Sequence, residues 1–113
     1  MSLDINLMVT KPTSVWDYNI THNLGKMADQ VRLSNGHTLY QVLWRPEELD
    51  FVYAGEIIRW LKEGLSILLS NPEKYKAYNP ENGWGSYEGL VQFVEEYIKA
   101  CIDNPEAKIE TCR

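Results

Sequence analysis

The feature that most constrains the fold is the spacing of apolar residues in segment 54–68. Apolar side chains recur there every third or fourth residue, at Ala54, Ile57, Ile58, Leu61, Leu65 and Leu68. Charged and polar residues fill the opposite face, at Glu56, Arg59, Glu63 and Ser66. This period predicts an amphipathic helix, which must bury its apolar face against other elements. We therefore expect segment 54–68 to form the backbone of the core.

A second long helix is predicted after Ser86, which is a good N-cap residue. Its apolar face is formed by Leu90, Val91, Val94, Tyr97, Ile98 and Cys101. Asn104-Pro105-Glu106 ends it, because proline cannot continue a helix. The apolar faces of these two long helices need a further layer of structure to pack against.

That layer is predicted at the two ends of the chain. Leu3–Val9 alternates apolar and polar residues before Met8, which is typical of a strand with one buried face. Val15–Ile20 is rich in β-branched and aromatic residues, and a short turn after Lys11-Pro12 would pair it with the first strand. Segment 107–112 can return as a third strand, which places both termini in one sheet.

Shorter helices are expected between these elements. Thr21 can cap a helix whose apolar stripe runs from Leu24 to Val31 and closes at Asn35-Gly36. Thr38-Leu-Tyr-Gln41 is a capping box for a second short helix, which Pro46 ends while starting another. The order predicts an α+β fold in which about four helices cover a small, mostly antiparallel sheet.

Length and charge limit the class of protein. A chain of 113 residues suits a single domain spanning 1–113. The net charge of −5, with no cluster of Lys and Arg, argues against nucleic acid as a partner. No apolar stretch is long enough to span a membrane and the N-terminus lacks a signal-peptide pattern, so we expect a soluble, cytoplasmic protein.

The candidate functional residues are concentrated in Asp17–Leu24. His22 is the candidate general base, because imidazole as a group titrates near neutrality, and Asn19, Thr21 and Asn23 are nearby to orient it or to bind a ligand. The alternative is structural, because Thr21 and Asn23 would satisfy the backbone donors of a helix start and leave His22 without a chemical role.

Two further segments carry polar and aromatic groups. In Trp44-Arg45-Pro46-Glu47, the arginine can bind an anionic ligand or form a clasp with Trp44 and Glu47 or Glu48. In segment 79–88, with Asn82, Trp84 and Tyr87, the glycines around the tryptophan allow either a tight loop that plugs the core or a ligand lid. No metal and no cofactor is expected, because the two histidines are far apart and Cys101 and Cys112 have no zinc spacing.

These segments also resemble a family of small uncharacterised proteins of bacteria and their phages. The similarity lies in three blocks: Asn19–Leu24 with Lys26–Ala28, Leu43–Glu47, and Asn79–Gly85 with Tyr87-Glu88. It would span nearly the whole chain and implies only that the three blocks are to be treated as one possible site, without implying an activity. The polar stretch 30–37 departs from the pattern, which leaves His37 outside the site.

The leading hypothesis is therefore a binding or accessory protein with a polar and aromatic cleft for a protein partner or a small anionic ligand. The alternative is a metal-independent hydrolase or transferase, with His22 as general base, Arg45 stabilising an anion and Asn23 or Asn82 orienting the substrate. A third hypothesis is a homo-oligomer with Trp16, Trp60 and Trp84 at its interface.

Overall fold

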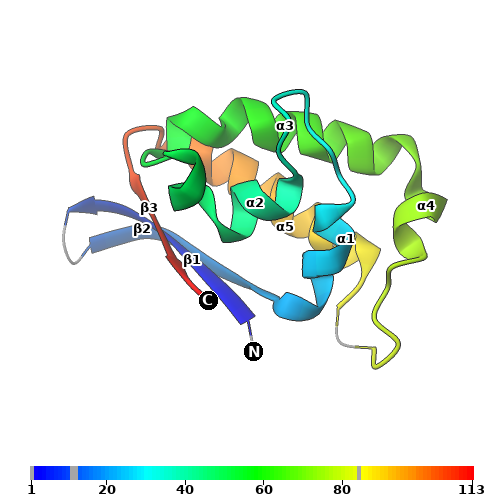
Figure 1. The fold of residues 1–113 in the computed structure, drawn as a ribbon. Coiled ribbons are helices and arrows are strands. Elements are labelled where there is room, and N and C mark those ends of the chain that lie inside the picture. The colour runs from blue at the N-terminus through cyan, green and yellow to red at the C-terminus, as the bar shows by residue number, and fades with distance from the viewer. Residues whose placement is uncertain (1, 11–12, 84) are drawn as a thin grey trace.

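The computed structural model describes residues 2–10, 13–83 and 85–113, and the side chains of these ranges apart from 9, 10 and 13–15. It confirms the α+β class (Figure 1). The elements in chain order are β1 (Ser2–Thr10), β2 (Thr13–Thr21), η1 (His22–Leu24), α1 (Gly25–Asp29), α2 (Leu39–Trp44), η2 (Pro46–Leu49), α3 (Ala54–Ser70), α4 (Pro72–Lys76), α5 (Tyr87–Asp103) and β3 (Lys108–Cys112).

The sheet is antiparallel with the strand order β2-β1-β3, so the N-terminal and C-terminal strands lie in one sheet, as predicted, and are neighbours in it. Leu3 lies opposite Ile20 and Ile5 opposite Tyr18, while Leu7 lies opposite both Trp16 and Ile109. Directly opposed residues share a face, which makes this the inner face of the sheet. Leu3, Ile5 and Leu7 are fully buried there, as the period-two pattern predicts.

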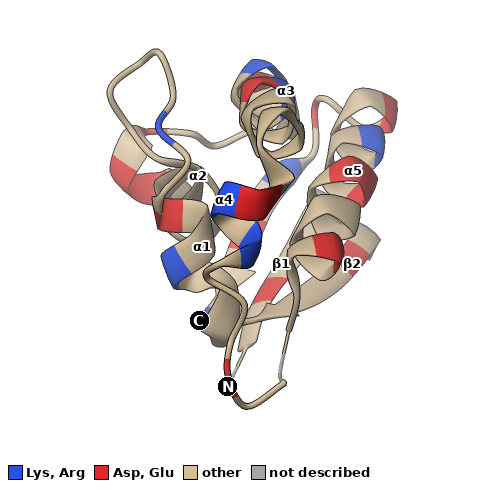
Figure 2. Ribbon diagram, turned by 90° about the vertical axis from the view of Figure 1, so that its right-hand side faces the viewer, with Lys and Arg blue, Asp and Glu red and all other residues tan. Residues whose placement is uncertain are grey.

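Helices cover the inner face and leave the outer face open (Figure 1). α5 packs over β2, where Tyr97 stacks on Trp16 with 5.2 Å between ring centroids and Phe93 meets Tyr18 at 5.4 Å. α3 packs against α5 on the side away from the sheet, and α1 and α2 lie beside them (Figure 2). The apolar stripe predicted for α3 is confirmed, with Ile57 and Leu61 fully buried.

Close packing between α2 and α3 depends on one small residue. A Cβ atom at Gly64 would lie 2.8 Å from a methyl group of the buried Leu39. The start of α2 carries the expected capping box, because the Thr38 side chain accepts from Gln41 N–H while the Gln41 side chain accepts from Thr38 N–H. The start of α5 is capped by Ser86, also as predicted.

The helix predicted over 21–35 is shorter than the stripe suggests. Thr21 does cap it, accepting from Asn23 N–H, but η1 and α1 end at Asp29. The chain then turns back, and Leu39 N–H donates to Val31 O while Arg32 and Thr38 form a β-bridge. Val31 is buried all the same, so its place in the apolar stripe reflects burial in a turn rather than helix.

The segment after Pro46 also differs from the prediction, because it forms only the short 3₁₀ helix η2. Asp50 ends it in a left-handed conformation with φ of 61°. α3 is a separate helix that begins at Ala54. In its first turn, the Glu56 side chain accepts the backbone N–H groups of Tyr53 and Val52. These two bonds hold the pKa of Glu56 below its usual value, the bond from Tyr53 contributing most.

One buried polar atom in the core carries a prediction. The Tyr97 hydroxyl is fully buried and has no hydrogen-bond partner within the described part of the chain. The Tyr87 hydroxyl is also buried but donates to Leu68 O at 2.7 Å. Tyr97→Phe is expected to raise the free energy of unfolding by about 1 kcal/mol, because it removes an unsatisfied group.

Tyr87→Phe is the matched control, and it is expected to lower the free energy of unfolding by about 1 kcal/mol because it breaks a made hydrogen bond. Urea denaturation of the two variants beside the wild-type protein measures both values. A loss of stability in Tyr97→Phe equal to that in Tyr87→Phe would mean that the Tyr97 hydroxyl is satisfied in solution.

Candidate functional site

Two of the three polar segments meet at the corner between β2 and α1. The indole N–H of Trp44, at the end of α2, donates to Nδ1 of His22 at 2.7 Å. Trp44 is buried and His22 is half-buried. An imidazole that accepts at Nδ1 is neutral and carries its proton on Nε2. The contact therefore fixes both the position and the tautomer of His22.

Tyr40 extends this ring cluster toward the surface. It lies one turn before Trp44 on α2, and the two rings stack with 5.2 Å between centroids. The absence of a side chain at Gly25 lets α1 approach, because a Cβ atom there would lie 3.2 Å from the Tyr40 ring. The rings of Tyr40, Trp44 and His22 thus form one continuous aromatic wall.

A hollow opens beside this wall. It has a volume of about 270 Å³ and is lined by Gly25, Lys26, Asp29 and Tyr40. The Asp29 carboxylate accepts from the Thr38 hydroxyl at 2.9 Å. Lys26 is exposed and forms no ion pair with any of the described residues. The hollow therefore combines a tyrosine ring with a cation that is available to a ligand.

Arg45 lies at the end of α2 and adopts the clasp rather than a position extended into solvent. Its guanidinium forms an ion pair with Glu48 at 3.3 Å. Contact with the Tyr40 hydroxyl, followed by the charge of Glu48, raises the pKa of Arg45 above its usual value. Arg45 thus ties the Tyr40 ring to η2, and its role in binding a ligand stays a prediction.

Glu47 is held by the C-terminal residue. The Arg113 guanidinium donates to the Glu47 carboxylate and to Trp44 O, the latter at 2.7 Å. This contact joins the end of β3 to the junction between α2 and η2. Arg113 contacts Trp44 only through its backbone oxygen, so Glu47 acts here as an anchor for the C-terminal residue.

The third segment reaches the same corner through Gly85. Its φ of 109° lies in the left-handed region, and a Cβ atom there would lie 2.8 Å from a Thr21 methyl carbon. Only glycine fits this approach. Trp84 lies outside the described residues, so the choice between plug and lid stays open. Residues of all three segments therefore lie at this corner, at Thr21, at the Trp44–His22 contact and at Gly85.

The other predicted ligand residues lie around or away from this corner. Asn23 is exposed in η1, and Asn82 is exposed in the loop before α5. Asn19 lies opposite Asp4 on the outer face of the sheet. Tyr87 is buried, and its backbone N–H donates to the Asn79 side chain at 2.8 Å. Their ligand contacts stay predictions.

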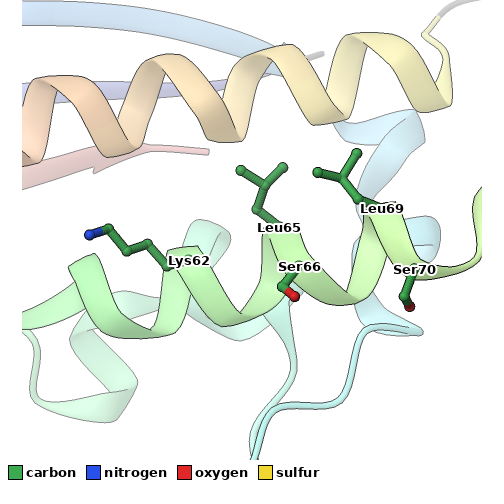
Figure 3. A pocket seen from close by; sticks show the side chains of 5 residues that line it. All are labelled: Lys62, Leu65, Ser66, Leu69 and Ser70. Atoms are coloured by element: carbon green, nitrogen blue, oxygen red, sulfur yellow. The ribbon is translucent and has the colours of Figure 1, made fainter.

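Two other hollows lie outside this corner. One of about 220 Å³ on the sheet is lined by residues of β1 and β2, among them Asp4, Asp17 and Tyr18. The other, of about 500 Å³, is formed by α3 residues, and Figure 3 shows Leu65 and Leu69 pointing from α3 toward α5. Neither contains His22, Trp44 or Arg45.

Metal-ligand groups and membrane-spanning helices can be checked in the described part of the chain. No group of three or more His, Cys, Asp or Glu side chains is placed there to hold a metal ion. Among the same residues, no helix has the length and apolar character needed to cross a membrane.

Sequence reasoning did not name Tyr40 or Arg113 as contributors, and it placed Lys26 in a block of the resemblance without giving it a role. Tyr40 carries a usable signal, because it precedes Trp44 by one helical turn in a segment predicted to be helical. Gly25 inside a predicted helix is a second signal, since glycine there is typical of a close approach. Nothing local distinguishes Arg113.

Comparisons of the chain with protein-family models, with curated protein sequences and with solved structures give no match.

Proposed function

We propose that this is a small binding protein whose site is the hollow beside Tyr40, and that its ligand is a small anion with a flat apolar part. The observation that carries this proposal is the pairing of Lys26, which has no ionic partner among the described residues, with the Tyr40 ring in one hollow. An ammonium group binds a carboxylate or phosphate, and an aromatic wall binds the apolar part.

The surroundings support a preformed site. Trp44 backs Tyr40, His22 and Arg45 hold the two ends of the aromatic wall, and Asp29 is engaged by Thr38 rather than by Lys26. Groups held in place before binding cost less conformational entropy when the ligand arrives. The volume of about 270 Å³ suits a ligand of single-ring size. The resemblance to small bacterial and phage proteins stays a prediction.

The enzyme alternative, with His22 as general base, ranks second. In the observed contact Nδ1 accepts from Trp44 and Nε2 carries the proton, so the ring offers no lone pair to a substrate. A base is normally oriented by a carboxylate, and no ion pair of His22 with a carboxylate is found within the described residues. The alternative stays a prediction.

Binding can be tested with benzoate, which joins a ring to one carboxylate, and with inorganic phosphate as an anion without a ring. We expect benzoate to bind with a Kd on the order of 1 mM and to shift the amide NMR signals of residues 24–29 and 39–45. Phosphate is expected to bind more weakly. Lys26→Ala should weaken benzoate binding about tenfold, because it removes a charged hydrogen bond.

Lys99→Ala is the matched control, since Lys99 is also exposed but lies on α5, where it pairs with Glu96. It should leave benzoate binding unchanged. The proposal fails if Lys26→Ala and Lys99→Ala weaken binding equally, or if benzoate shifts signals over the whole surface.

A further inference from the structure

The two edges of the sheet differ in whether another segment pairs with them. The outer edge of β3 is covered by the segment before α3, where Ile109 N–H donates to Val52 O at 2.9 Å and Tyr53 forms a bridge with Lys108. β2 forms the other edge. In the described residues its only strand partner is β1. Every second residue of an edge strand directs its backbone N–H and C=O outward, so β2 offers these groups within residues 17–21, where its pairing with β1 is regular.

The inner side of this open edge is aromatic. Trp16 is half-buried and Tyr18 is 39% exposed, and their rings stack with 5.8 Å between centroids. Both continue the aromatic packing of Tyr97 and Phe93 on α5. An added strand would cover the exposed part of Tyr18 with its own inward side chains.

The outer side of the same edge is acidic. Asp17 and Asn19 are exposed on β2, and the neighbouring strands place Asp4 and Glu110 on the same face. Lys108 is the one basic side chain on the described part of this face. Figure 2 shows Asp and Glu segments, in red, on the strands and along α5. The open edge therefore has an apolar side and a negatively charged side.

We propose that β2 is a docking edge for an extended segment of another protein, which adds as a fourth strand and alternates basic with apolar side chains. Backbone pairing with β2 supplies affinity. The basic residues of the segment face Asp17 and the acidic outer face, while the apolar residues contact Trp16 and Tyr18. A second copy of this chain is a poor occupant, because its own β2 would place a second Asp17 near the first. Each copy also carries a net charge of −5, so the two copies repel one another. This proposal does not depend on the hollow beside Tyr40.

The test uses a synthetic peptide that alternates Lys and Val, with the full-length protein. We expect it to bind and to slow hydrogen exchange at outward-facing amides of β2. A peptide that alternates Glu and Val is expected to bind at least about tenfold more weakly, because its charges lie beside Asp17 at the edge of an acidic face. Asp17→Lys should weaken binding of the Lys-Val peptide about tenfold, whereas Asp103→Lys, at the exposed end of α5, should not.

A Lys-Val peptide with N-methyl groups on one backbone edge separates strand pairing from charge attraction, since it keeps every side chain and charge. Loss of its binding supports the fourth strand, and binding equal to that of the parent peptide overturns it. Equal binding of the Glu-Val peptide overturns the assigned partner chemistry. Slowed exchange in β2 without peptide, together with a dimeric mass, overturns the proposal in favour of a second copy.

Discussion

Trp44→Ala is expected to lower the free energy of unfolding by about 3–5 kcal/mol. The side chain is only 1% exposed, stacks on Tyr40 and donates to His22. Truncation leaves a cavity between α2 and the corner and removes the contact that fixes His22. Urea denaturation followed by circular dichroism measures the loss.

Two controls separate packing from the hydrogen bond. Trp44→Phe keeps a ring but lacks the donor, so it should lose less stability than Trp44→Ala while freeing His22. Trp60 is half-buried beside Arg59, and Trp60→Ala should therefore cost clearly less than Trp44→Ala. Equal losses at Trp44 and Trp60 would show that Trp44 is not the packing centre of the corner.

The second large effect is a loss of stability at alkaline pH. Burial raises the pKa of the Cys101 thiol from 9.0 to about 12, and burial raises the pKa of Tyr97 well above its usual value. Below about pH 8 both groups are almost entirely neutral in the folded and the unfolded chain. Above it the unfolded chain releases protons that the folded chain retains, so stability falls by up to about 1.4 kcal/mol per pH unit for each group.

This dependence is measured by urea denaturation at several values between pH 8 and pH 11. The loss should begin near the ordinary pKa of Cys101, 9.0, and steepen near that of Tyr97, 10.0. Cys101→Ala should flatten the first part of the curve, even though it also lowers the stability at pH 8. Cys112 is exposed, and Cys112→Ala should leave the curve unchanged. An unaltered slope in Cys101→Ala would contradict the assignment.

The three strands, the two long helices and their caps follow from local patterns. Leu3, Ile5 and Leu7 alternate with polar residues, and Thr38 and Gln41 have the spacing of a capping box, so neighbouring residues alone indicate the element. The end of α1 was not predicted correctly, because Val31 is buried by a tertiary contact and not as part of the helix. It is buried in a turn that pairs with Leu39, and periodicity cannot distinguish burial in a turn from burial in a helix.

The candidate site was less predictable than the fold. The sequence pointed to Thr21, His22, Trp44 and Arg45, all of which lie at the corner. It did not name Tyr40 and gave no role to Lys26, although both line the hollow. For Arg45 the sequence allowed an anion site or a clasp with Trp44 and Glu47 or Glu48. The structure shows the ion pair with Glu48, and the ligand role stays a prediction. Residue types mark polar segments well, whereas the wall of a hollow depends on which side chains the packing leaves at the surface.

By itself, the sequence determined the α+β class, the buried faces of strands and helices, and the segments where polar groups gather, because these depend on periods of two and 3.6 residues and on local caps. Only the tertiary structure decided which segments meet. Trp44 reaches His22 across 22 positions, and Arg113 reaches Glu47 across 66. The open edge at β2 is likewise a consequence of β3 pairing with β1 and of residues 52–53 covering β3. Such contacts follow from how whole elements pack, and no local pattern encodes them.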